Sequence, residues 1–328
     1  MPGTVWTEDL RMWVLLVDSI TLITGLPANL LALFIFIRKM RQRATPLDVL
    51  LLNLNISDLV FLLFLPFHTK EAADMKWTVS YFLCPLSGFI FYSTFHNSIL
   101  LLTAIGVERY LGVAFPIAYK LKRDPRMAVL ASFMIWILSM GHCSIVYFMQ
   151  YYKHNKTQLD PSHKNSCYKE FSDEQLSVLL PFRLELAIVL FSIPFIISCF
   201  CYVKFIFILS RLPNFNRKKR LRAIGLALVT FLVFIICFMP LNLSHVVGFI
   251  YWNSPKWRVY ALLPSTLNAS LDPFIFYFSS SALRDTINHS LRRLAIRLSF
   301  RFSTTENKQT SRTEESSRDN QLQTTTDF

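Results

Sequence analysis

The sequence predicts an all-helical membrane protein: a bundle of seven transmembrane helices followed by a short amphipathic helix. Hydrophobic residues make up 53% of the 328 residues and charged residues only 17%, where soluble domains carry about 25% charged residues. Seven apolar stretches are long enough to cross a bilayer, which takes about 20 residues each. Basic residues gather in every second connection between those stretches. This composition disfavours both a soluble enzyme and a disordered chain.

The seven expected spans follow one another along most of the chain. They cover residues 13–37, 46–68, 81–110, 127–149, 178–208, 223–250 and 259–278. Several contain proline, which membrane helices tolerate when neighbouring helices satisfy the freed backbone groups. We therefore expect an extracellular segment at 1–12 and the bundle at 13–278.

The location of the basic residues predicts the orientation. The chain carries a net charge of +13, and segments 38–43, 120–126, 211–222 and 284–301 together hold nineteen basic residues against two acidic ones. The remaining residues are net negative, and the connection 150–177 is balanced. Because positively charged loops lie in the cytoplasm, we expect the N-terminus outside the cell membrane and the C-terminus in the cytoplasm. A basic soluble protein would suggest nucleic acid, but here no nucleic-acid partner is expected.

The cysteines agree with this orientation. Four of the six lie inside spans and are expected to be small buried side chains. Cys84 begins the third span and Cys167 lies in the outward loop before the fifth, so both face an oxidising compartment, where we expect them to form a disulfide. The same loop contains Asn155-Lys156-Thr157, a glycosylation acceptor sequence. The first 12 residues lack the apolar core of a cleavable signal peptide.

Two further segments follow the seventh span. Residues 279–301 carry Leu and Ile at helical spacing with Arg between them, which is typical of an amphipathic helix on the anionic inner leaflet of a membrane. Residues 302–328 are polar and rich in Ser and Thr. We expect this tail to be disordered and cytoplasmic.

Short motifs occur in the spans in a fixed order. The third span ends in Glu108-Arg109-Tyr110, and the second span contains a lone acid, Asp58. The other motifs are Trp136 in span four, Pro194 and Tyr202 in span five, Cys237-Phe238-Met239-Pro240 in span six and Asp272-Pro273-Phe274-Ile275-Phe276-Tyr277 in span seven. Each is weak alone, since an Arg at a helix end can simply extend its charge to the membrane surface. Together the motifs resemble the rhodopsin-like G-protein-coupled receptors over residues 13–300.

This resemblance implies how the signal leaves the receptor. Positions implied in activation or in coupling to a heterotrimeric G protein are Glu108, Arg109, Tyr110, Tyr202, Phe238, Pro240, Asp272, Pro273 and Tyr277. In many relatives an acid at the start of span six holds the arginine, whereas here residues 217–220 read Arg-Lys-Lys-Arg. Because no acidic lock is available there, we hypothesise detectable basal signalling. A phosphorylated tail would carry the negative charge that arrestins read.

The resemblance also implies an ion site in the core. Asp58, Ser98, Asn268 and Asp272 match positions that hold an allosteric sodium ion in many such receptors. Ligands that are all oxygen suit a hard cation. The alternative is a water-bridged polar network. No other metal and no cofactor are expected.

Cationic side chains in the outer halves of the spans indicate the ligand. Arg183 lies near the start of span five, His245 in the outer half of span six, and Arg258 at the start of span seven. Arginine is costly in a membrane, so each must reach the surface, pair, or face a polar cavity; for Arg258, reaching the surface explains its position equally well. Glu185 lies on another helix face and does not simply neutralise Arg183. This arrangement suits a small carboxylate, which guanidinium groups bind with two hydrogen bonds.

The sequence around these residues is similar to the free fatty acid receptors. The similar segments are Leu180-Pro181-Phe182-Arg183-Leu184-Glu185, Asn242-Leu243-Ser244-His245-Val246-Val247-Gly248 and Leu267-Asn268-Ala269-Ser270-Leu271-Asp272-Pro273. The resemblance implies that Arg183 and Arg258 bind the carboxylate, that His245 supports it, and that Tyr92 and His142 line the pocket. His245 matches the members that respond to short-chain acids. The resemblance thus implies a receptor, not an enzyme, for acetate, propionate and butyrate that signals through Gi/o and Gq/11.

The sequence departs from the short-chain pattern at two places. Leu241 stands where those members have Tyr, and Lys169 stands where an acid is usual, with Glu170 one place later. These departures leave open a receptor for longer-chain fatty acids or for another small organic anion. A secondary transporter is a distant alternative, since transporters tend to show inverted repeats and none is visible here.

Overall fold

The computed structural model describes residues 6–80, 82–122, 124–151, 167, 171–212, 216–279 and 284. Several sequence predictions lie outside these residues. They are the glycosylation acceptor Asn155, the departure at Lys169 and Glu170, the amphipathic helix expected over 279–301, and the tail at 302–328. The structure can therefore be compared with the sequence predictions for the helical bundle and not with these four.

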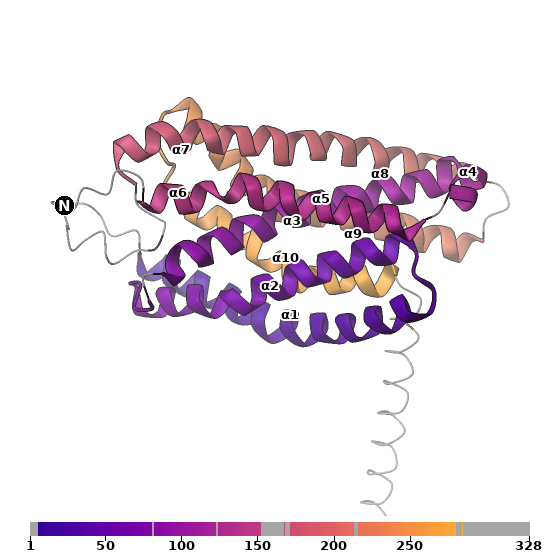
Figure 1. Cartoon of the computed structure of the whole chain (residues 1–328), viewed down its shortest axis with the longest axis horizontal. Coiled ribbons are helices and arrows are strands. Elements are labelled where there is room, and N and C mark those ends of the chain that lie inside the picture. Colours follow the sequence, from indigo (N-terminus) through magenta and orange to yellow (C-terminus); the bar gives the residue numbers. More distant parts are fainter. Residues whose placement is uncertain are drawn as a thin grey trace, which may run out of the picture. The chain divides into compact units, whose positions relative to one another are not determined.

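The first half of the chain forms three long helices and two short ones (Figure 1). The long helices are α1 (Glu8–Arg43), α2 (Pro46–Asp74) and α3 (Leu83–Ala114). A short helix, α4 (Pro116–Lys122), follows α3. The fourth expected span is divided between α5 (Pro125–Cys143) and α6 (Ile145–Tyr151).

The second half of the chain supplies the remaining elements. The fifth expected span consists of α7 (Asp173–Leu186), a π-helical segment η2 (Ala187–Ser192) and α8 (Ile193–Arg211). Two helices complete the bundle, α9 (Arg217–Ile250) and α10 (Arg258–Ser279). Each of the seven expected spans thus corresponds to helix, with the prolines at 27, 66, 181, 240, 264 and 273 inside helices.

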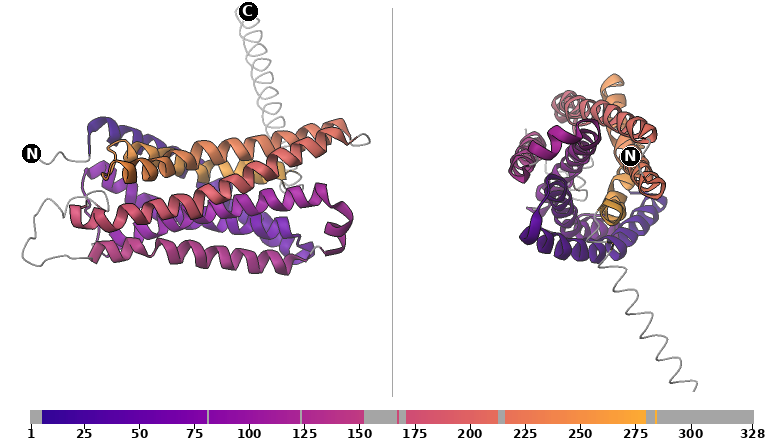
Figure 2. Two further views of the ribbon diagram at one scale, coloured as in Figure 1. Left: turned by 90° about the horizontal axis from the view of Figure 1, so that it is seen from above. Right: turned by 90° about the vertical axis from the view of Figure 1, so that its right-hand side faces the viewer.

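The helices lie side by side with their axes roughly aligned, as Figure 2 shows from two directions. Helix α1 packs against α2 and α10, and α10 packs in turn against α9. Helix α3 contacts α2, α5, α8 and α9, so it is the central helix. Many large apolar side chains point outward, including Leu63, Phe133, Ile196 and Phe274. Water would not favour such a surface, whereas lipid would.

Six helical segments are long and apolar enough to cross a membrane. They are Glu8–Gln42, Pro46–Asp74, Leu83–Ala114, Pro125–Met149, Asp173–Arg211 and Arg217–Ile250. The seventh expected span, α10, is not among them. Helix α10 carries Ser265, Thr266, Asn268, Ser270 and Asp272, all of them buried inside the bundle. Its polar residues lower its hydropathy and face protein instead of lipid.

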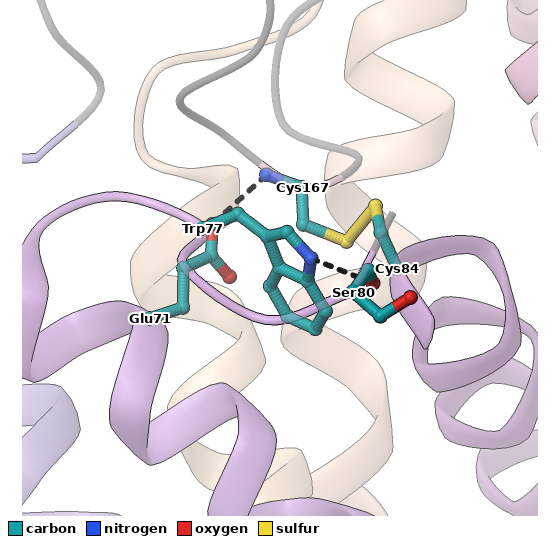
Figure 3. Close-up of a disulfide and its surroundings, with 5 residues drawn as sticks. All are labelled: Glu71, Trp77, Ser80, Cys84 and Cys167. Atoms are coloured by element: carbon teal, nitrogen blue, oxygen red, sulfur yellow. Dashed lines mark hydrogen bonds between the residues drawn. A yellow bond between two sulfur atoms is a disulfide. The ribbon is translucent and has the colours of Figure 1, made fainter. Parts of the chain in front are cut away.

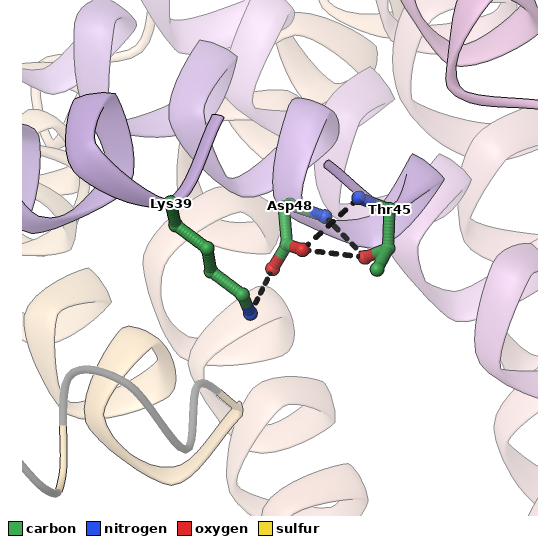
Figure 4. Close-up of polar contacts among 3 residues, drawn as sticks. All are labelled: Lys39, Thr45 and Asp48. Atoms are coloured by element: carbon green, nitrogen blue, oxygen red, sulfur yellow. Dashed lines mark hydrogen bonds and ion pairs between the residues drawn. The ribbon is translucent and has the colours of Figure 1, made fainter. Parts of the chain in front are cut away.

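Polar contacts at helix ends set the junction between α1 and α2. Thr45 caps α2: the Asp48 backbone N–H donates to Thr45 Oγ1 at 3.2 Å, and the Thr45 backbone N–H donates to Asp48 Oδ2 at 3.1 Å. Lys39, near the end of α1, forms an ion pair with Asp48 Oδ1 at 2.6 Å (Figure 4). The capping box satisfies donors that a helix start leaves free, and the ion pair joins the two helices at the turn.

Helix α3 defines the two ends of the bundle. Cys84 lies at its start and Arg109 near its end, about 37 Å apart at 1.5 Å per residue. We call these the disulfide end and the Arg109 end. The candidate ligand-binding residues gather toward the first, and the expected signalling residues toward the second.

Candidate functional site

The disulfide end is held together by the predicted bond between Cys84 and Cys167. Their Cα atoms lie 5.6 Å apart, which confirms this prediction. The backbone N–H of Cys167 also donates to Glu71 Oε1 of α2 at 2.9 Å (Figure 3). Beside them, the Trp77 indole N–H donates to the carbonyl oxygen of Ser80 at 3.2 Å. Cys167 is therefore joined to α3 by the disulfide and to α2 by a hydrogen bond.

Arg258 begins α10 and turns into the bundle. Its side chain is buried, with 4% exposed, and its Nη2 donates to the hydroxyl of Tyr92 on α3. The guanidinium carbon lies 5.9 Å from the centre of the Tyr92 ring. Among the described residues Arg258 forms no ion pair. The structure thus brings these two predicted residues together and points the Arg258 side chain inward.

Arg183 approaches the same region from α7. It is also 4% exposed, and its Nη1 donates to Ser254 Oγ at 3.4 Å. Its guanidinium carbon lies 5.0 Å from the centre of the Phe171 ring. A guanidinium group stacked on an aromatic ring can still donate hydrogen bonds from its edge.

His245 on α9 interacts electrostatically with both arginines. Its side chain is 1% exposed, and both arginines are close enough to interact with its charge. Neither ring nitrogen has a hydrogen-bond partner within the described part of the chain. Buried polar groups are rarely left without a partner, so His245 is suited to a partner that is not part of the bundle.

His142 occupies a different place. Its Nδ1 lies 3.1 Å from Glu185 Oε1, and its ring is 6.5 Å from that of Phe182. The pair joins α5 to α7. Glu185 therefore faces α5 and not Arg183, as helix geometry predicts. The described polar partner of His142 is this carboxylate.

A cavity adjoins α10, the helix that carries Arg258, and no residue of α7 belongs to its described lining. It has a volume of about 80 Å³ and lies between α2, α3 and α10. Arg258 and Tyr92 line it together with apolar side chains that include Phe61, Phe64, Phe91 and Leu262. Neither Arg183 nor His245 belongs to its described lining. The sequence motifs did not indicate this cavity, because no single helix reveals it.

A second cavity lies deeper in the bundle. Asp58, Ser98 and Asn268 line it, and Asn268 donates through Nδ2 to Asp272 Oδ2 at 2.9 Å. One oxygen of each of Asp58, Asn268 and Asp272 has no hydrogen-bond partner in the described ranges. Three of the four predicted residues thus line one cavity, and Asp272 is joined to them by its hydrogen bond with Asn268.

Arg109 is held by hydroxyl groups. Its Nη1 donates to Thr230 Oγ1 on α9 at 3.2 Å and its Nη2 donates to Ser279 Oγ on α10 at 2.8 Å. Neighbouring Glu108 instead accepts a hydrogen bond from the hydroxyl of Tyr119 on α4. The described hydrogen bonds of Arg109 thus go to the two hydroxyls and not to Glu108. The residues Thr230 and Ser279 escaped the sequence analysis because a single hydroxyl in a helix carries no distinctive pattern.

The other predicted signalling residues lie on α3, α8, α9 and α10. Tyr202 is buried. Its ring packs closely against Gly106 of α3, since a Cβ atom added to that glycine would lie only 3.2 Å from the ring. Tyr110 packs against Phe200 at 5.6 Å between ring centres, and Phe238 packs against Phe95 at 5.2 Å. Pro240 and Pro273 lie inside α9 and α10. At the end of the last motif Phe276 is fully buried against Phe36, while Tyr277 is half-buried, so Phe276 is the residue that faces the core.

Comparisons with known proteins show what the chain is similar to. Residues 28–276 match the family model described as "7 transmembrane receptor (rhodopsin family)". The chain is 46% identical to human free fatty acid receptor 3 over 89% of this chain and 84% of that protein. It is 46% identical to human free fatty acid receptor 2 over 88% of this chain and 87% of that protein, and 48% identical to mouse free fatty acid receptor 2 over 82% of each.

Proposed function

Since the chain belongs to the rhodopsin family of seven-transmembrane receptors and, within it, to the free fatty acid receptors, we propose that short-chain fatty acids activate it. Acetate, propionate and butyrate bind with their carboxylate between Arg183, Arg258 and His245. The protein is a multi-pass membrane receptor and not an enzyme. The observation that carries the proposal is the burial of these three side chains, from three helices, at the disulfide end.

The chemistry of the three side chains favours a carboxylate. A buried guanidinium group is costly unless it is paired and hydrogen-bonded. The described hydrogen bond of Arg258 goes to the neutral hydroxyl of Tyr92. An arriving carboxylate would supply the compensating negative charge and would accept hydrogen bonds from a guanidinium group at two oxygens. Because the three side chains belong to α7, α9 and α10, such a ligand would also draw three helices together.

The expected affinity is low. Acetate has four heavy atoms, and the best small ligands reach about 1.5 kcal/mol per atom, which sets a ceiling of about 6 kcal/mol. That ceiling corresponds to a Kd of roughly tens of micromolar. A receptor of this kind responds only to abundant acids, which suits the products of fermentation.

Substitution of the two arginines tests this proposal. We expect Arg183→Ala and Arg258→Ala to abolish the G-protein response to propionate while surface expression persists. Arg11→Ala is the matched control, since Arg11 lies on α1 and pairs only with Glu8 among the described acids. A propionate response that survives either core substitution contradicts the carboxylate site.

The membrane orientation follows from the same proposal. The disulfide end faces outward, the N-terminus is extracellular, and the C-terminus is cytoplasmic. Helix α10 is the seventh span, and its buried polar residues explain its lower hydropathy. An epitope tag at the N-terminus would then be stained on intact cells, and one at the C-terminus only after permeabilisation. The reverse staining pattern contradicts this orientation.

Signalling partners are proposed at the Arg109 end. Heterotrimeric G proteins of the Gi/o and Gq/11 classes engage there, arrestin reads the phosphorylated tail, and lipid headgroups contact the basic segments. A supporting observation is that α9 begins with Arg217, Lys218, Lys219 and Arg220, all of them at the exposed start of the helix.

The deeper cavity suits a sodium ion. Asp58, Ser98 and Asn268 line the cavity, Asp272 is hydrogen-bonded to Asn268, and side-chain oxygens of these four residues are the donors that a hard cation takes. Two buried carboxylates close enough to interact also call for positive charge. We therefore propose that these four residues hold an allosteric sodium ion, in preference to a purely water-bridged network.

One observation favours a second candidate, a receptor for longer fatty acids or another small organic anion. Leu241 is fully buried, and it stands where the short-chain members carry Tyr. An apolar side chain there removes one hydrogen-bond donor from the pocket region. Dose–response curves for acids of two to twelve carbons separate the two candidates, because a maximum potency beyond six carbons would favour the second.

A further inference from the structure

We propose that the cavity between α2, α3 and α10 receives the acyl chain of the bound acid, and that Leu262 on its wall limits the length of that chain. The ligand class is the unbranched saturated monocarboxylates. This inference rests on the carboxylate site proposed above and adds the direction in which the rest of the ligand points.

The cavity begins where the carboxylate site ends. Arg258 and Tyr92 belong to its lining, and they are bonded to each other. A carboxylate on the Arg258 guanidinium group therefore adjoins this cavity directly. Arg183 and His245 are not part of the described lining, so in this proposal the acyl chain extends from Arg258 away from them.

The walls next to Arg258 are apolar and already packed. Phe61 of α2 meets Phe91 of α3 at 5.9 Å between ring centres, and Phe91 meets Tyr92 at 5.1 Å. Leu262 lies one helical turn beyond Arg258 on α10, on the same face. Each methylene buried here would raise affinity at most about fourfold.

The opposite direction is less favourable for an acyl chain. Arg183 lies beside the hydroxyl of Ser254, and the nearby end of α7 carries the ion pair between Glu185 and His142. A chain that pointed there would bury charged groups against methylenes, which costs free energy without a compensating bond. The apolar chain therefore favours the cavity on the α2 side.

Polar groups end the apolar wall. His68 lines the cavity, and its Nδ1 lies 2.9 Å from Oδ2 of Asp18, which is fully buried on α1. Glu71 and Cys167, which Figure 3 shows joined by their hydrogen bond, line it as well. A methyl group that reached these groups would displace their hydration. The volume of about 80 Å³ is also small beside the roughly 300–1,000 Å³ of pockets for larger ligands.

Two opposite substitutions at one position test the proposal. Leu262→Trp fills the cavity and Leu262→Ala enlarges it, while Tyr260→Trp, at a side chain that is 42% exposed on the same helix, is the matched control. The measurement is the potency of acids of two to six carbons in a G-protein activation assay, with surface expression measured for each variant. We expect Leu262→Trp to leave the potency of acetate within about threefold of the wild type. The potency of pentanoate should fall at least tenfold, which corresponds to the loss of about two buried methylene groups. Leu262→Ala should shift the preference toward longer acids, and Tyr260→Trp should change nothing.

Removing the Asp18–His68 pair provides an independent test. The double substitution Asp18→Asn with His68→Leu removes both members of this pair and keeps Glu71, and we expect it to improve the potency of hexanoate relative to acetate at least threefold. If the Leu262 variants change all acids by one common factor, or change none, the acyl chain does not lie in this cavity.

The two proposals fail in different ways. If Arg258→Ala still responds to propionate, the carboxylate site itself is wrong. If Arg258→Ala is silent but the Leu262 variants and the double variant keep the wild-type ratio of hexanoate to acetate potency, only the placement of the acyl chain is wrong. If the Leu262→Trp receptor does not reach the cell surface, Leu262→Ala and the double variant provide the test. Neither of these adds a large side chain at a packed position.

Discussion

Arg109 donates a hydrogen bond from Nη2 to Ser279 Oγ at 2.8 Å, across 170 residues of sequence. Together with Thr230 on α9, this bond ties α3 to two other helices at the Arg109 end. Both acceptors are neutral hydroxyls, whereas an acid would hold the arginine by an ion pair. Since a neutral acceptor binds a charged donor less strongly than a carboxylate does, the tie is a weak one.

The weak tie predicts detectable basal signalling that increases when a hydroxyl is removed. Ser279→Ala and Thr230→Val should each raise ligand-free G-protein activation several-fold over the wild type, because a hydrogen bond to a charged group contributes about 1.5–3 kcal/mol. Ser210→Ala is the control, since its hydroxyl bonds only to the Phe207 carbonyl among the described groups. If cells that express the wild type show no ligand-free signal above that of mock-transfected cells, the basal-activity hypothesis is wrong.

Tyr92 should orient Arg258 without selecting the length of the ligand. Tyr92→Phe removes the hydroxyl that accepts from Arg258, so the guanidinium group loses one fixed contact. We expect the potency of every short acid to fall by a similar factor, on the order of tenfold, for a loss of about 1.4 kcal/mol. The ratio of pentanoate to acetate potency should stay at the wild-type value. A change in that ratio would contradict a purely orienting role.

Glu71 should stabilise the disulfide end beyond the covalent bond. Its carboxylate accepts the backbone N–H of Cys167 from a buried position. Glu71→Ala leaves that N–H without its acceptor and should cost about 1–3 kcal/mol, seen as a lower melting temperature of the purified receptor. Glu71→Gln keeps a carbonyl oxygen and should lose less. Equal melting temperatures for both variants and the wild type would show that this contact contributes nothing.

The sodium proposal predicts an ion-specific effect. Exchanging sodium for choline at constant ionic strength should raise agonist affinity several-fold in the wild type, as expected when the ion favours the ligand-free arrangement. Asp58→Asn removes one charged oxygen from the cavity and should abolish this dependence. Binding of a radiolabelled or fluorescent ligand, together with a surface-expression control, measures both. Sodium sensitivity that persists in Asp58→Asn would favour the water-bridged network.

Much of the architecture was predictable from local sequence. Apolar runs of about 20 residues, separated by charged connections, are a property of neighbouring residues, and every predicted span corresponds to helix. The pairing of Cys84 with Cys167 was predictable because the other four cysteines lie inside spans. The candidate carboxylate residues were also visible in sequence, since Arg183 and Arg258 stand on apolar segments where arginine is costly.

The partners of those residues were not predictable, because they depend on how each helix is rotated and on which helix lies beside it. Glu185 faces His142 on α5 and not Arg183, and Arg109 meets Thr230 and Ser279. The cavity beside Arg258 needs three helices, α2, α3 and α10, to enclose it. The amino-acid sequence by itself therefore determined the spans, the disulfide and the cationic residues, since composition and spacing are local. Only the tertiary structure decided which groups those residues contact, because packing joins residues that are between 43 and 170 positions apart.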